Sequence, residues 1–239
     1  MRFTPFASSS EGCCYLLESG NLPPLLLDCG LRIEQIKRLM KFKTSNLGAI
    51  LISHAHQDHA RGAFAFAKRG ARLIGSAETA AKIREGDWLI PYPKKVYLVE
   101  GWRISAFEVP HDEPGTLAFI VSDQSEKTLL YLTDAAYSPY TFDELKLTHI
   151  AIECNHSRAI IQEKRASDAI GSQQFRRTVS THMSLERLVE LLRANRLPNL
   201  EEIHLLHLSD ANSDEAEFKS EIQRVTGVPV YVAPKRRSA

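Results

Sequence analysis

Short runs of apolar residues alternate along the chain with longer segments whose apolar positions recur at helical spacing. The runs have the length and the bounding turn residues of buried strands. Because the early strands follow one another with few helices between them, an α/β sandwich of layers is favoured over a purely doubly wound parallel sheet. We predict strands at residues 14–17, 25–28, 49–53, 72–74, 96–99, 104–109, 117–121, 128–132, 150–153, 203–206 and 230–232.

Three amphipathic segments predict helices. The best marked lies near the C-terminus, where Asn212 and Glu215 have the spacing of a capping box and Gly227 is the predicted stop. Apolar positions that share a helical face are Ile33, Ile36 and Met40 in the first helix, Leu185, Leu188, Val189 and Leu192 in the second, and Phe218, Ile222 and Val225 in the third.

Composition indicates an ordinary globular protein. The chain has 239 residues, of which 44% are hydrophobic and 25% charged, with a formal net charge of +1. That charge excludes a global electrostatic attraction to nucleic acid or membrane, so any basic surface must be local. Without a linker, repeat, signal peptide or membrane span, we expect one domain over residues 1–239. The four cysteines, two of them adjacent, do not form a disulfide framework, and we expect a reduced, cytoplasmic protein.

Two basic segments stand out from this balance. Residues 157–181 carry Arg158, Lys164, Arg165, Arg176 and Arg177. The segment could be a solvated helix and loop, or a basic flap beside an anionic substrate. The final Lys235-Arg236-Arg237 is interpreted as a solubilising tail.

The strongest chemical signal is the run His54-Ala55-His56-Gln57-Asp58-His59, which directly follows the predicted strand 49–53. Side chains two apart on a strand share a face, so His54 and His56 project together. Asp58 and His59 begin the next helix and can point at a neighbouring ion. Imidazole and carboxylate ligands together suit Zn²⁺, Mn²⁺ or Fe²⁺. A purely structural cluster is the alternative.

Further ligand types occur where other predicted strands run out into loops. His111 follows strand 104–109, Asp134 follows strand 128–132, and His207 follows strand 203–206. Any one of them alone could be a strand-end cap. Together with the first motif they favour a two-metal site, in which the ions lower the pKa of a bridging water and stabilise the attacking and leaving oxygens.

These ordered motifs resemble those of the metallo-β-lactamase superfamily. The resemblance implies a four-layer αββα sandwich of the metallo-β-lactamase type, with a dinuclear site at one edge. It implies that His54, His56 and His111 hold the first ion. Asp58, His59 and His207 would then hold the second ion, with Asp134 bridging both.

Other segments resemble the YycJ-like nucleases and phosphodiesterases within that superfamily. The carboxylate Glu153 begins one such segment, and the sequence departs from the branch pattern at Cys13, where Asn is usual, and at Ser157, where Asp is usual. The segments are Ser9-Ser10-Glu11-Gly12-Cys13-Cys14-Tyr15, Leu27-Asp28-Cys29-Gly30, Glu153-Cys154-Asn155-His156-Ser157, His182-Met183-Ser184 and His207-Leu208-Ser209 with Asn212.

The leading hypothesis is a dinuclear metal-dependent hydrolase, a phosphodiesterase or nuclease of the DNA or RNA exonuclease type, that uses a metal-bridging hydroxide. Its expected cofactors are two divalent ions, Zn or Mn, and its expected partner is nucleic acid or a nucleotide, not a membrane. Asp58 is placed to orient the attacking water. His182 or His156 could protonate the leaving alkoxide, and His156 could instead orient a ligand.

Alternatives of the same fold are a cyclic-nucleotide or other small phosphodiester hydrolase and a thioester or lactone hydrolase; a binding protein with structural metals is a third. Tyr137 and Tyr140, just after Asp134, could stack on bases. His149 and His204 are interpreted as ordinary strand residues.

Overall fold

The computed structural model describes residues 1–235, which divide into two compact units. Unit 1 comprises Met1–Glu108, Glu113–Lys127 and, of the described residues, those from Ala233 to Lys235. Unit 2 comprises Val109–Asp112 and Thr128–Val232. The expectation that residues 1–239 form one domain stays a prediction. Arg236 and Arg237 of the expected tail lie outside the described residues.

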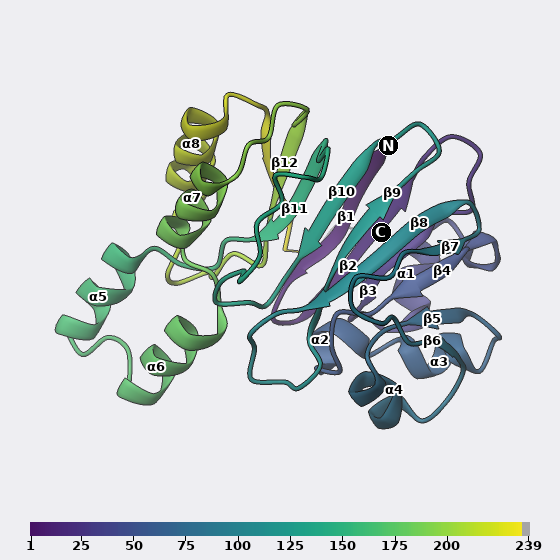
Figure 1. Ribbon diagram of the computed structural model, residues 1–239. Helices are drawn as coiled ribbons and strands as arrows, with labels where there is room; N and C mark the ends of the chain where they lie inside the picture. The colour runs from purple at the N-terminus through teal and green to yellow at the C-terminus, as the bar shows by residue number, and fades with distance from the viewer. Residues whose placement is uncertain (236–239) are drawn as a thin grey trace. The chain divides into compact units, whose positions relative to one another are not determined.

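A six-stranded mixed sheet dominates unit 1 and appears in purple and blue in Figure 1. Its first three strands are antiparallel, and the remaining strands run parallel to the third. In spatial order the strands are β1 (Arg2–Ser9), β2 (Gly12–Glu18), β3 (Leu25–Cys29), β4 (Ala49–Leu51), β5 (Arg72–Ile74) and β6 (Asp87–Leu89). The β3 and β4 strands therefore end at the same edge, where the chain continues into the histidine run.

Short helices cover one face of this sheet. They are α1 (Ile33–Leu39), α2 (Gln57–Ala60), α3 (Ala63–Ala67) and α4 (Ala77–Ile83), and a 3-10 turn occupies Thr44–Asn46. One apolar cluster joins Ile36 of α1 and Phe66 of α3 to Leu26 and Ile50 of the strands. Burial of such side chains is the main favourable term in folding. It fixes the position of α2, which lies between α1 and α3 in the chain.

Unit 1 also contains an antiparallel meander of β7 (Tyr97–Val99), β8 (Trp102–Glu108) and β9 (Leu117–Ser122). The backbone N–H of Leu117, at the start of β9, donates to the carbonyl of Ser53 at 2.9 Å. This bond ties the meander to the segment that enters the histidine run.

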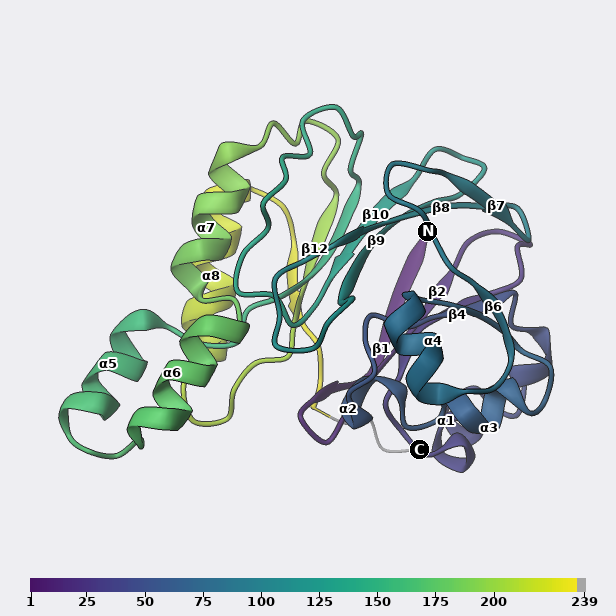
Figure 2. The ribbon, with the colours of Figure 1, turned by 60° about the horizontal axis from the view of Figure 1, so that its bottom comes forward.

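Unit 2 is built on four parallel strands, β10 (Thr128–Leu132), β11 (His149–Glu153), β12 (Glu202–Leu206) and β13 (Val230–Val232). The helices α7 (Leu185–Ala194) and α8 (Glu215–Thr226) lie side by side, and α5 (Arg158–Ala166) and α6 (Ser172–Thr181) form a hairpin that extends away from the strands (Figures 1 and 2). Among the described residues, no helix is long and apolar enough to cross a bilayer.

All eleven predicted strands are present, with ends that differ by a few residues. Two strands were missed: β1, whose alternation is broken by Pro5 and by a bulge between Pro5 and Ala7, and the three-residue β6.

The capping prediction for the last helix was wrong by two residues. Asp214, and not Asn212, is the N-cap, and its side chain accepts from the Glu217 N–H at 2.9 Å. Gly227 ends this helix with φ +73° as predicted.

The basic segment 157–181 forms the helices α5 and α6. Three of its five cations lie near carboxylates that reduce the local positive field, and a fourth donates to a backbone carbonyl. Arg158 lies near Glu186 and Glu190, Lys164 donates to the Ala211 carbonyl, Arg165 pairs with Asp168, and Arg177 pairs with Asp112. Its role as a basic flap stays a prediction.

Candidate metal centre

The histidine run of unit 1 lies where β4 ends and α2 begins. His56 is the N-cap of α2, and Asp58 and His59 lie in its only turn, as the sequence predicted. His54 and His59 are fully buried, and their ring centroids are 4.2 Å apart. The structure thus brings four predicted ligands of unit 1 together, and Asp58 Oδ2 lies 3.7 Å from His59 Nε2.

Asp28, at the end of β3, holds this arrangement in place and was not predicted as a site residue. It is completely buried and has φ +52°, a conformation that costs energy for any residue other than glycine. Its Oδ1 accepts from the Ser53 N–H at 2.7 Å, and its Oδ2 accepts from the Ser53 hydroxyl at 2.9 Å and from His59 Nδ1 at 2.7 Å. With its proton on Nδ1, His59 presents Nε2 as its ligand atom.

The rings of His54 and His56 lie close enough together to bind the same ion. The Ser53 hydroxyl donates to Asp28, so it accepts from His54 Nδ1 at 3.0 Å, which leaves His54 Nε2 as a ligand atom. That nitrogen lies 3.0 Å from His56 Nδ1. Two nitrogens on one tetrahedral zinc, at bond lengths of about 2.0–2.1 Å, lie about 3.3 Å apart. These donors fit a divalent metal ion.

Close backbone packing fixes α2 against the end of β3. A Cβ atom on Gly30 would lie 1.6 Å from the carbonyl oxygen of Asp58, so only glycine allows this approach. The carbonyl of Cys13 accepts from the Gly30 N–H at 2.8 Å.

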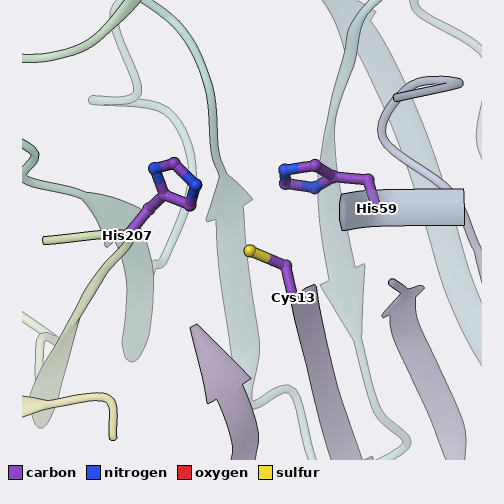
Figure 3. Close-up of side chains that lie close together, drawn as sticks. All are labelled: Cys13, His59 and His207. Atoms are coloured by element: carbon purple, nitrogen blue, oxygen red, sulfur yellow. The ribbon is translucent and has the colours of Figure 1, made fainter. Parts of the chain in front are cut away.

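The thiol of Cys13 lies close to His59, and Figure 3 shows both side chains. The Cys13 Sγ is buried and lies within 4.8 Å of a ring nitrogen of His59. Cys13 is therefore a potential soft ligand that the sequence marked only as a departure.

A second group of donors gathers at the carboxyl ends of the parallel strands of unit 2. Asp134 follows β10 and His207 follows β12, and both have left-handed backbone conformations, with φ +49° and +53°. Such strained residues persist only where their surroundings hold them, and they gather at functional sites. The side chains of Asp134, Glu153, His182 and His207 offer ligand atoms within 4.8 Å of one another. The ring of His207 is drawn in Figure 3.

Glu153, at the end of β11, organises this group. It is fully buried; its Oε2 accepts from the backbone N–H groups of Ala135 at 3.2 Å and Met183 at 3.1 Å. Its Oε1 lies 2.6 Å from His182 Nδ1 and 3.3 Å from His207 Nδ1. The sequence marked Glu153 as part of a family-like segment but gave it no role, because its four partners come from distant parts of the chain.

Charge within this group sets the state of His182. Burial lowers the pKa of His182, but the charge of Glu153, the hydrogen bond to Glu153 and the charge of Asp134 all raise it, and the net direction is upward. Burial likewise raises the pKa of Glu153, while His182 lowers it, with a net downward direction. The two side chains thus favour an imidazolium–carboxylate pair. The His182 side chain is 19% exposed, so the ring keeps access to a ligand.

The remaining predicted residues of unit 2 differ in their environments. His111, in the loop Val109–Asp112, lies 6.1 Å from the His182 ring centroid, and its Nε2 is 3.0 Å from Asp112 Oδ1. Burial lowers the pKa of His111, which favours the neutral form that metals bind. Burial lowers the pKa of His156 to about 4, and its buried Nδ1 makes no hydrogen bond to the described residues. His149 and His204 lie within β11 and β12 as expected.

The chain belongs to the family described as the beta-lactamase superfamily domain, whose model matches residues 24–207. The chain is 27% identical over 234 residues to the exodeoxyribonuclease WalJ of Streptococcus pneumoniae (serotype 2, strain D39), with 89% of this chain and 83% of WalJ covered. The metallo-β-lactamase fold protein YhfI from Bacillus subtilis matches with a TM-score of 0.73 and 18% identity, over 98% of this chain and 97% of that one. Zn²⁺-bound PqqB from Methylobacterium extorquens matches with a TM-score of 0.71 and 11% identity, over 99% of both chains.

These comparisons confirm the expected fold class, the αββα sandwich of the metallo-β-lactamase type, and the resemblance to the YycJ-like branch. Family membership and the imidazole and carboxylate donors of both units together indicate a metal-dependent hydrolase that binds divalent ions.

Proposed function

We propose that the protein is a dinuclear metal-dependent phosphodiesterase that cleaves nucleic acid, with exonuclease-type cleavage of DNA as its leading activity. The likeness to the exodeoxyribonuclease WalJ, over most of both chains, supports this substrate class. The four buried, free cysteines fit the reducing, cytoplasmic location expected from the sequence.

In this proposal seven side chains hold two ions, Zn²⁺ or Mn²⁺. Bound ions of this kind supply an activated water nucleophile and neutralise charge on a phosphoryl oxygen. Asp58, whose side chain is 22% exposed, orients the water and accepts its proton. Membership of the superfamily supports His54, His56 and His111 for one ion, Asp58, His59 and His207 for the other, and Asp134 as the bridge.

The observation that carries the proposal is the Glu153–His182 pair. Two backbone N–H groups fix Glu153 Oε2, so Oε1 holds His182 at 2.6 Å with its proton-bearing Nδ1 toward the carboxylate. An imidazolium held this way can donate from Nε2 to a leaving oxygen. An alkoxide leaves a phosphodiester only with a proton, whereas a thiolate leaves a thioester readily because its pKa is about 8.5. The pair therefore favours phosphodiesters over thioesters.

His156 is the less suitable proton donor of the two histidines. With a pKa of about 4 it is neutral at pH 7. Its backbone carbonyl accepts from the Leu185 N–H at 2.9 Å, and it forms a bridge with Ser184, so it serves to hold the start of α7.

The proposal is tested by comparing His182→Ala with wild type on two substrates. Single-stranded DNA has a poor leaving group, and we expect its cleavage to fall by about 10²–10⁴-fold. Bis(p-nitrophenyl) phosphate releases an anion that needs no proton, so its hydrolysis should fall far less. His204→Gln, a histidine substitution elsewhere in unit 2, is the control and should match wild type on both. Equal losses on both substrates for His182→Ala would contradict the role of proton donor.

A further inference from the structure

The loop that follows Asp134 presents two aromatic side chains on the surface of unit 2. Tyr137 and Tyr140 are 49% and 47% exposed, so about half of each side chain is open to a ligand. A turn around Pro139 separates them, in which the Ser138 hydroxyl accepts from the Tyr140 N–H at 3.2 Å. Both tyrosines therefore belong to the same short loop.

The loop is anchored to α7 at both ends. Arg187 Nη1 donates to the Ala136 carbonyl at 2.9 Å, and the Phe142 N–H donates to Asn195 Oδ1 at 2.5 Å. The Arg187 guanidinium also lies 5.9 Å from the centroid of the Tyr137 ring, in cation–π range. Because these contacts hold the loop, the aromatic rings are positioned before any ligand arrives, which reduces the entropy lost on binding.

Between this loop and α7 lies a cavity of about 320 Å³. Its volume is at the small end of the range for ligand pockets, about 300–1,000 Å³. The lining residues are Tyr137, Ser138, Pro139, Tyr140, Thr141, Arg187, Glu190, Leu191, Ala194 and Asn195.

The charge of the lining selects a flat, neutral ligand over an anion. Arg187 is the one cation among the lining residues, which also include the carboxylate Glu190, and it already donates to the Ala136 carbonyl. A phosphate would meet little net positive charge here. An aromatic ring with polar edges could instead stack on a tyrosine and place its donors and acceptors against Asn195 and Thr141.

We propose that this cavity, which we call the tyrosine pocket, binds an unpaired nucleobase of a single-stranded DNA substrate beside the metal ligand Asp134. Tyr137 is three residues from Asp134, so their Cα atoms are at most about 11 Å apart. A base must leave its duplex partner to expose its faces for stacking, and tyrosines stack on any base with little sequence preference. The inference rests on the proposed nuclease function and adds to it a preference for single strands or frayed ends.

The test measures binding apart from cleavage. Metal-loaded protein is titrated against a fluorescent single-stranded oligodeoxynucleotide with phosphorothioate linkages, which resist hydrolysis, and against the same strand with abasic sites. Wild type should bind the intact strand roughly 5–150-fold more tightly for each base stacked. Tyr137→Ala and Tyr140→Ala should lose much of this discrimination, and Tyr137→Phe should keep it. Tyr92→Ala removes a tyrosine of unit 1 that is 68% exposed, and it should behave as wild type.

The outcomes separate the inference from the proposed function. Equal affinity of wild type for intact and abasic strands, or no binding of either, overturns the tyrosine pocket. An equal loss in Tyr92→Ala also overturns it, because the effect would then not belong to this loop. If discrimination depends on Tyr137 but an unmodified strand is never cleaved, the pocket stands and the nuclease proposal fails.

Discussion

Replacing Asp28 with Asn should weaken metal binding through the tautomer of His59. In the native chain Asp28 Oδ2 accepts from His59 Nδ1 at 2.7 Å, which leaves His59 Nε2 without a proton and able to bind an ion. The Ser53 N–H, 2.7 Å from Oδ1, keeps the asparagine oxygen on its own side. The amide NH₂ then faces His59 Nδ1 as a donor, so the ring proton moves to Nε2, where it blocks ligation.

Two magnitudes follow from this geometry. Loss of a partner that orients a metal ligand costs about 10–100-fold in metal affinity, or about 1.4–2.7 kcal/mol. In the metal-free fold the charge-assisted hydrogen bond between residue 28 and His59 becomes a neutral one, which lowers the free energy of unfolding by about 1–1.5 kcal/mol. The Ser53 hydroxyl rotates to a new acceptor.

Competition with a chromophoric zinc chelator measures the affinity, and urea unfolding of metal-free protein measures the stability. Asp123→Asn is the matched control: Asp123 is a buried carboxylate of unit 1 that accepts from the Ser19 hydroxyl and from the N–H groups of Ser125 and Lys127. The Asp123→Asn variant should lose a comparable free energy of unfolding and keep the zinc affinity of the wild type. Unchanged zinc affinity in Asp28→Asn, or the same loss in both variants, would refute the reasoning.

Three further predictions concern the same centre and its surroundings. Asp134→Ala should lose activity and bound metal while circular dichroism stays native; normal turnover with two ions bound would remove Asp134 from the centre. Gly30→Ala should lower both the melting temperature and the metal content, because the added Cβ would lie 1.6 Å from the Asp58 carbonyl oxygen, and wild-type values would count against this packing. The pKa of His156 is about 4 in the folded chain and about 6.5 in the unfolded chain. Between pH 7 and pH 5 only the unfolded chain gains a proton at this residue, so the free energy of unfolding of the metal-free protein should fall by about 2 kcal/mol. His156→Gln should remove that loss in urea unfolding, and an unchanged pH dependence would contradict the burial argument.

Local sequence was enough to predict most of the fold. The strands of unit 2 are mostly apolar, as buried parallel strands are, and each was found within a residue of its ends. Helices α2 and α3 have four and five residues, too few for a periodic pattern to emerge. The last helix shows a different limit, because Asn212 and Asp214 are both good N-caps and only the folded chain decides between them.

Some residues of the site could be predicted from neighbouring positions in the sequence, and others only from tertiary contacts. His54, His56, Asp58 and His59 are contiguous, so one pattern revealed them all. Asp28 shows no such pattern, since its partners lie 25 and 31 residues further along the chain. A residue that acts by orienting other side chains is visible only once tertiary contacts are formed. Its position at the end of a strand, within the family-like segment Leu27-Asp28-Cys29-Gly30, was the signal that the sequence offered.

The central claim is that the protein is a metal-dependent nuclease. It is tested most directly by incubating a single-stranded DNA oligonucleotide with protein stripped of metal, and then with the same protein after metal is restored. Chromatography of the products measures release of nucleotides over time. We predict no release by the stripped protein and progressive release from one end of the strand after Mn²⁺ or Zn²⁺ is restored. Full activity of rigorously metal-free protein, or no cleavage with both metal ions supplied, would contradict the account.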